Sequence, residues 1–245
     1  MTQSINKSEI NKFTNISYDW WNPRGKFTAL HRINPLRIKF ILDITYNHFN
    51  ITSFDKKPLS GLKILDIGCG GGLTCEPIAK LGGFVKGIDA DKQAIHIAKE
   101  HSSIENLDIH YENKSIEMLK LNDKNKFDII FALEIIEHID DPTNFLEKIN
   151  PFIRDNGLIF ISSINKNLKS LLFAKIAAEY FLGWVPKGTH DWQKFIEPNK
   201  LNSQMAELNY DFITSKGIVF DPIKMAWKLS EDLSINYISS YQKLI

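Results

Sequence analysis

The chain has 245 residues, 43% hydrophobic and 24% charged, which is an ordinary composition for a globular protein with a single α/β domain. Its 30 Lys and Arg residues against 29 Asp and Glu residues leave a net charge of +1, so the basic excess of a nucleic-acid-binding protein is absent. Two cysteines, Cys69 and Cys75, provide neither a disulfide framework nor a zinc site, and we expect a reducing, cytoplasmic location.

The predicted elements begin with an N-terminal helical cap over residues 1–60. The cap has a loop at residues 20–25 and a helix starting near Pro35, because proline is tolerated in a first helical turn. From Lys63 onward, short apolar runs alternate with helical stretches, which is typical of a mostly parallel sheet covered by helices. The first five predicted strands are residues 63–67, 84–89, 107–111, 127–133 and 157–163.

A helical insertion or lid is predicted over residues 165–196, after the fifth strand. The longest apolar stretch, residues 168–185, contains charged residues and is not expected to cross a membrane. The chain closes with a helix near residues 198–208 and two strands at 212–220 and 235–243. Ending on two strands favours a seven-stranded sheet whose last strand is inserted antiparallel. We therefore expect residues 1–245 to form one α/β domain.

A glycine-rich turn follows the first predicted strand, in the sequence Asp66-Ile67-Gly68-Cys69-Gly70-Gly71-Gly72. Glycines let the backbone approach a ligand closely, and Asp89 at the end of the next strand would lie beside the turn and accept both hydroxyls of a ribose. Leu73 stands where a dinucleotide fingerprint has its third glycine, and the lysine of a phosphate-binding loop is missing. The pattern favours an adenosine-like ligand. The alternative is a tight strand-to-helix turn without a ligand.

The segment from Leu65 to Gly72 resembles the signature of class I methyltransferases, which have a Rossmann-like fold and bind S-adenosylmethionine. Three more segments together resemble the ubiquinone-biosynthesis O-methyltransferase family: Trp20-Trp21 with Leu30–Arg37, Leu133–His138, and Val185–Trp192. The resemblance covers nearly the whole chain. It implies methylation of ring hydroxyls on polyprenylated phenol and quinol precursors. The cofactor contacts that it implies are Arg37, Asp66, Gly68, Gly70, Asp89 and Leu133.

Glu134, Glu137 and His138 follow the predicted fourth strand, at the carboxyl edge of the sheet, where open α/β folds bind ligands. Helical spacing would put the three side chains on one face. They could hold a divalent ion, and the resemblance implies Mg²⁺. His138 could instead be the general base for a phenol, whose free pKa is near 10, or the acids could only complement a helix dipole. His190 is a second candidate base, or else a surface residue.

The predicted insertion is basic and apolar, with Lys166, Lys169, Lys175 and Lys187 opposed only by Glu179 between residues 165 and 187. This pattern favours peripheral contact with an anionic membrane at its inner face, with a lid helix packed on the domain as the alternative. The leading hypothesis is an O-methyltransferase of ubiquinone biosynthesis that associates with other enzymes of the pathway. The alternatives are a methyltransferase for another small acceptor, an NAD-dependent dehydrogenase and a non-catalytic cofactor-binding scaffold.

Overall fold

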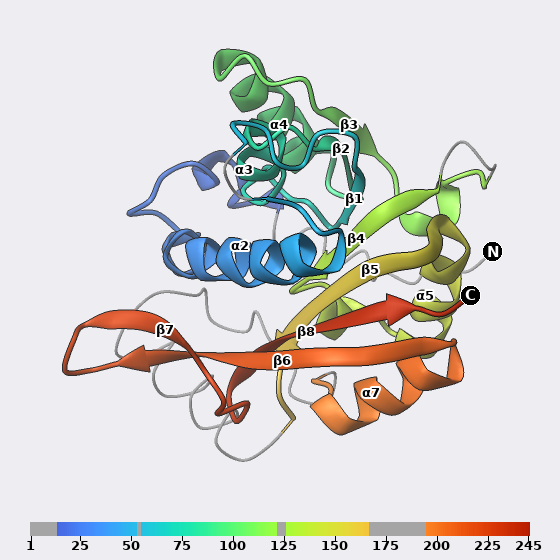
Figure 1. Ribbon diagram of the computed structural model, residues 1–245. Coiled ribbons are helices and arrows are strands. Elements are labelled where there is room, and N and C mark those ends of the chain that lie inside the picture. Colours follow the sequence, from blue (N-terminus) through green and yellow to red (C-terminus); the bar gives the residue numbers. More distant parts are fainter. Residues whose placement is uncertain (1–13, 53–54, 122–125, 167–194) are drawn as a thin grey trace.

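The computed structural model describes residues 14–52, 55–121, 126–166 and 195–245, which form a mixed eight-stranded sheet with helices packed on it (Figure 1). The strands lie in the order β3-β2-β1-β4-β5-β8-β6-β7. The strands are β1 Lys63–Ile67, β2 Phe84–Asp89, β3 His110–Asn113, β4 Phe127–Leu133, β5 Ile153–Ile164, β6 Tyr210–Asp221, β7 Ala226–Ser230 and β8 Asn236–Lys243. The helices are α2 Thr28–His48, α3 Cys75–Lys80, α4 Lys92–Ile104, α5 Pro142–Ile149 and α7 Pro198–Glu207, and the 3₁₀ turns are η1 Ser17–Asp19, η2 Ile116–Met118, η4 Ile136–His138 and η5 Asn150–Phe152.

Strands β1 to β5 pair in parallel, whereas β8 pairs antiparallel with both β5 and β6. The predicted Rossmann-like fold with an inserted antiparallel last strand is therefore confirmed. The predicted number of seven strands is wrong, because β7 adds an eighth strand antiparallel to β6. Every residue of β7 is exposed or only half-buried, so its sequence lacks the apolar run by which a strand is recognised.

The predicted starts of α2, β3 and β5 also differ from the structure by three residues or more. Strand β5 begins at Ile153, four residues before the predicted residue 157. Helix α2 begins at Thr28, and Pro35 lies inside it instead of in its first turn. The turns before Pro35 are held by tertiary contacts: the His31 ring lies 2.8 Å from the Trp20 carbonyl oxygen, and Asn34 donates to the Leu73 carbonyl oxygen. These contacts offset the backbone hydrogen bond that proline cannot make. Strand β3 starts three residues later than the predicted residue 107, at an exposed edge of the sheet.

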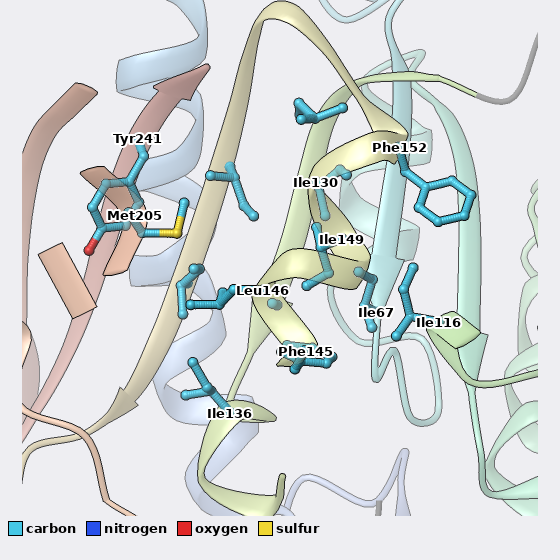
Figure 2. Packing of buried hydrophobic residues seen from close by; sticks show 14 of the residues in the cluster. Ile67, Ile116, Ile130, Ile136, Phe145, Leu146, Ile149, Phe152, Met205 and Tyr241 are labelled. Atoms are coloured by element: carbon cyan, nitrogen blue, oxygen red, sulfur yellow. The ribbon is translucent and has the colours of Figure 1, made fainter. Parts of the chain in front are cut away.

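The sheet carries a hydrophobic core on each face. Side chains of α2, α3 and α4, among them Phe40, Ile78 and Ala98, form one core with Ile64 and Phe160 of the sheet. The other core is formed by α5 and α7 with the opposite side chains of the same strands. In Figure 2, the α5 residues Phe145, Leu146 and Ile149 lie against this face, close to Ile130. The two covered faces leave the carboxyl ends of the parallel strands as the place where loops converge.

In the described part of the chain, no helix is long and apolar enough to cross a membrane. Residues 167–194, which make up most of the predicted insertion, lie outside the described residues.

We expect Phe160→Ala to lower the free energy of unfolding by about 3–5 kcal/mol, because it leaves a cavity in the core beneath α2. Phe160 is fully buried, with its ring centroid 5.9 Å from that of Phe131 and 6.2 Å from that of Phe40. Urea unfolding followed by circular dichroism measures the change. Phe84→Ala is the matched control, since Phe84 is 65% exposed and its loss should change stability by less than about 0.5 kcal/mol. Equal losses in the two variants would contradict this packing.

Candidate functional site

The turn after β1 has a backbone that glycine tolerates best. Gly68 and Gly70 have φ angles of +74° and +52°, in the left-handed region that other residues adopt at a cost. The Gly68 and Cys69 amides donate to the Ile88 carbonyl oxygen at 2.8 and 3.1 Å. A Cβ atom on Gly68 would lie 2.4 Å from Cδ1 of Ile135. The turn is thus tied to the end of β2 and has no room for side chains at these positions.

Asp89 closes β2 and is held against the glycine turn. Its Oδ2 accepts the Gly70 amide at 2.9 Å, and its Oδ1 accepts the Asp91 amide at 2.7 Å. Each carboxylate oxygen has two lone pairs, so both can still accept a ligand hydroxyl. Burial raises the pKa of Asp89 to about 6. The proximity of Asp89 to the turn, expected from the sequence, is present in the structure.

Asp66 is a second buried acid beside the turn. It is 3% exposed, and its Oδ2 lies 3.2 Å from the Cys75 thiol, which donates to it. Burial raises the pKa of Asp66 to about 7, while the Cys75 hydrogen bond and the charge of Arg37 oppose the rise. Asp89 lies near enough for its charge to raise this pKa further. A cationic ligand would stabilise both carboxylates in their ionised form.

A pair of tryptophans covers the glycine turn from the N-terminal side. The Trp20 ring lies over Gly70 and Gly71, where a Cβ atom would come within 2.4 and 2.5 Å of it. Phe27 stacks on Trp20 with ring centroids 3.8 Å apart. The Trp21 indole donates to the Gly71 carbonyl oxygen at 3.0 Å. The N-terminal segment therefore clamps the turn through both ring packing and a hydrogen bond.

Helix α2 extends the clamp from the turn to the end of β4. Asn34 donates to the Leu73 carbonyl oxygen at 2.7 Å and accepts the Thr74 hydroxyl at 3.2 Å. One helical turn further on, Arg37 is 4% exposed, and its Nη2 lies 2.5 Å from Oε1 of Glu134. Arg37 Nε is buried and has no hydrogen-bond partner among the described residues. A buried donor of this kind normally has an acceptor, so a ligand acceptor fits here.

Glu134 has a strained backbone. Its φ angle is +53°, and its amide donates to both the carbonyl oxygen and the hydroxyl of Ser162 at 3.1 Å. The Ser162 hydroxyl donates in return to Glu134 Oε1 at 2.8 Å. The expected helical face through residues 134–138 is absent, because only the 3₁₀ turn Ile136–His138 forms and Glu134 precedes it. Strain of this kind in a non-glycine residue is typical of functional sites.

Glu137 is a buried acid on the other side of this turn. It is 2% exposed; its Oε2 accepts the Ser163 hydroxyl at 3.0 Å, and its Oε1 has no hydrogen-bond partner in the described part of the chain. Burial, and then the charge of Glu134, raises the pKa of Glu137 to about 7, while neighbouring His138 lowers it. His138 is half-buried at the end of the same turn.

The predicted metal ligands are occupied by other contacts. Glu134 faces Arg37 and Ser162, and Glu137 accepts from Ser163. Among the described residues, no three His, Cys, Asp or Glu side chains are grouped so that they could hold a metal ion. As arranged, Glu134, Glu137 and His138 are not grouped as a metal centre, and metal binding by them stays a prediction.

The structure brings six predicted residues to one edge of the sheet, around the glycine turn and the end of β4: Arg37, Asp66, Gly68, Gly70, Asp89 and Glu134. Leu133, 9% exposed, ends β4 and belongs to the core beneath α2. His190 lies outside the described residues. The sequence assigned no role to Trp20, Asn34 or Ser162. Trp20 and Asn34 do stand in the segments that carry the family resemblance, which was the available signal for them.

Comparisons with known proteins identify the family of the chain. Residues 58–209 match a family model described as a methyltransferase domain. The ubiquinone biosynthesis O-methyltransferase of Pelagibacter ubique (strain HTCC1062) is 46% identical over 240 residues, covering 98% of this chain and 99% of the relative. The enzyme of the same name from Bartonella tribocorum is 40% identical over 96% of this chain and 95% of its own length.

Solved structures share the fold at low sequence identity. Magnesium protoporphyrin IX methyltransferase from Synechocystis PCC 6803, with SAH bound, superposes with a TM-score of 0.68 at 15% identity, over 97% of this chain and 100% of that chain. A plantazolicin methyltransferase, also with SAH bound, gives a TM-score of 0.63 at 15% identity, over 98% and 100% of the two chains.

We expect Gly71→Ala to displace Trp20 from the turn, because the new methyl group would lie 2.5 Å from Cγ of the indole ring. The variant should lose about 1–3 kcal/mol of stability and shift the tryptophan emission to longer wavelength. Thermal unfolding and fluorescence spectra measure both effects. The control is Gly61→Ala, where φ is +90° but no atom lies within 4 Å, so backbone strain should lower stability without a spectral shift. An unchanged spectrum in Gly71→Ala would contradict the clamp.

Proposed function

Because the chain belongs to the ubiquinone biosynthesis O-methyltransferase family, whose members are S-adenosylmethionine-dependent enzymes, we propose that it methylates ring hydroxyls of polyprenylated phenol and quinol intermediates. The observation that carries the proposal is the acidic edge at the glycine turn, where the charge of half-buried Asp89 acts on buried Asp66 and the Gly70 amide donates to Asp89. This edge suits a cationic adenosyl ligand and not a phosphate-rich one. Membership of the family also sets aside the dehydrogenase and the non-catalytic scaffold.

The residues around the turn support a specific placement of the cofactor. Asp89 would accept the ribose hydroxyls with the lone pairs that the backbone leaves unused. Gly68 and Gly70 would let the backbone approach the methionine part, and Asp66 would face its positive charge. Arg37 would bind the methionine carboxylate through its buried, unpartnered Nε. Leu133 would form an apolar wall at the end of β4.

Deprotonation of the acceptor is the step for which the chain itself must supply a group. S-adenosylmethionine, when bound, supplies an activated methyl group that an acceptor oxygen attacks in line. A phenol with a pKa near 10 is almost wholly protonated at neutral pH, so a nearby base raises the reactive fraction. His138 stands at the carboxyl end of β4, beside Glu137, and we assign it this role. His190 is the second candidate base.

A catalytic Mg²⁺ ion at Glu134, Glu137 and His138 stays a prediction. The present contacts of Glu134 and Glu137 do not form a metal centre, so the mechanism does not use one. Contact of residues 165–187 with the inner face of an anionic membrane, and association with other enzymes of quinone biosynthesis, also stay predictions. Residues 167–194, on which the membrane contact would depend, lie outside the described residues.

The proposed reaction is tested with the purified full-length chain, S-adenosylmethionine and two acceptors that share a catechol-type ring but differ in an isoprenoid tail. We expect a methyl group on a ring oxygen, identified by mass spectrometry, and a higher kcat/KM for the tailed acceptor. Methylation at equal rates would favour another small acceptor, and absence of transfer to either would refute the proposed reaction. Cells that lack the protein should accumulate the unmethylated quinone intermediates.

We expect the affinity for S-adenosylmethionine to fall by at least about tenfold between pH 8 and pH 5. Its positive charges favour ionised carboxylates, and burial raises the pKa of Asp66 to about 7 and that of Asp89 to about 6. Below these values protons compete with the cofactor, and above them the dependence should level off. Isothermal titration calorimetry at each pH measures the effect. Asp89→Asn should bind about tenfold more weakly at pH 8 and lose the lower inflection; an affinity that rises as the pH falls would contradict this assignment.

We expect His138→Ala to lower kcat by about a hundredfold or more and to leave the affinity for S-adenosylmethionine unchanged. The pH dependence of kcat should lose the inflection of a histidine, and an acceptor of lower phenol pKa should restore part of the rate. His96→Ala is the control, because His96 is an exposed residue of α4 paired with Glu100. If EDTA abolishes the wild-type rate and Mg²⁺ restores it, a metal and not His138 alone activates the phenol.

A further inference from the structure

We propose that the Trp20 indole N–H donates a hydrogen bond to the carboxylate of the bound cofactor's methionine part. This inference rests on the proposed function, because it names one more group of the same cofactor site. Trp20 is 8% exposed, and its Nε1 is buried with no hydrogen-bond partner among the residues that the structure describes. Tryptophan N–H groups usually find a partner when they are buried.

The Trp20 ring is packed among Phe27, Ala94 and the glycine turn. Phe27 stacks on the ring with an interplanar angle of 8°, and Gly70 and Gly71 lie against the indole as well. Cε2, the ring carbon bonded to Nε1, would lie 3.2 Å from a Cβ atom on Gly70. The six-membered ring of the indole therefore packs on Gly70, whose amide is bonded to Asp89, and Nε1 is bonded to the neighbouring Cε2. Trp20 occupies the space that a side chain at position 70 would take in the cofactor turn.

The charges around the turn select the carboxylate as the acceptor. Buried Asp66 and half-buried Asp89 suit the ribose and the cationic groups of the cofactor and would repel its one anionic group. On the N-terminal side, the cap offers two buried donors without acceptors, Trp20 Nε1 and Arg37 Nε. Both belong to the segment that covers the turn, together with Asn34. A carboxylate placed between these donors would satisfy both.

The neighbouring Trp21 makes different contacts and therefore serves as a matched control. Trp21 gives its indole N–H to the Gly71 carbonyl oxygen and stacks on the His101 ring at 3.5 Å. Its donor is already used within the protein. Removing that donor should weaken the clamp for any ligand of the turn. Trp20→Phe also shortens the ring that packs on Gly70 and Gly71, so the loss of its donor is read from the larger effect on a ligand that carries the carboxylate.

The test compares Trp20→Phe with Trp21→Phe in the full chain, with two probes measured by calorimetry. S-adenosylhomocysteine contains the carboxylate, and 5′-methylthioadenosine lacks the whole amino-acid part. We expect Trp20→Phe to bind S-adenosylhomocysteine about tenfold or more weakly and 5′-methylthioadenosine within about twofold of the wild type. Trp21→Phe should weaken both probes by the same factor. Equal changes for the two probes in Trp20→Phe, or no change, would overturn the proposal.

A measurement on the unaltered protein covers the case in which Trp20→Phe does not fold. In the ¹⁵N-labelled wild type, S-adenosylhomocysteine should move the assigned Trp20 indole N–H resonance downfield, and 5′-methylthioadenosine should not. A resonance that responds equally to both probes would refute the hydrogen bond. If wild-type protein binds S-adenosylhomocysteine but shows neither signature, only the Trp20 assignment fails. If it does not bind S-adenosylhomocysteine at all, the proposed function fails.

Discussion

The contact of the Trp20 ring with the bare backbone of Gly70 and Gly71 is the constraint on which the functional edge of this protein depends. It requires glycine at both positions, and it brings the N-terminal segment over the turn after β1. Helix α2 then follows a course that places Asn34 on the turn and Arg37 on Glu134. The packing of the Trp20 ring on the glycine turn therefore also fixes where the Arg37 side chain lies on α2.

The charges at this edge are balanced incompletely by the protein itself. Asp66 and Glu137 are buried and Asp89 is half-buried, and all three have raised pKa values. The buried Arg37 is paired with Glu134. These charges lower the stability of the fold, since isolated buried charges are destabilising. The arrangement is well suited to a ligand that carries both signs of charge, because each end meets groups of the opposite kind. The left-handed backbone of Glu134 likewise costs stability at a residue of the candidate site.

The sequence predicted the buried parts of the fold well and the exposed parts poorly. The bounds predicted for β1, β2 and β4 agree with the structure to the residue, because most of the apolar residues in these strands are buried. Strands β3 and β7 lie at the two ends of the sheet, where half of each pattern is polar. The glycine turn and Asp89 could be predicted to meet, since neighbouring parallel strands end together. The contact of Trp20 with a turn fifty residues away, and the left-handed backbone of Glu134, depend on tertiary packing that no local pattern encodes.

The position of β8 has a consequence for how the chain is made. The last strand in sequence, Asn236–Lys243, is not at an edge but between β5 and β6, with a full ladder on each side. During synthesis the earlier strands must wait with an open flank until the final residues leave the ribosome, and β6 cannot join the parallel strands before then. A nonsense mutation that removed only these last residues would take out the middle of the sheet, leaving two unpaired edges prone to association with other chains. Strand β8 is therefore part of the core of this protein, and a truncation that reached into it would expose that core.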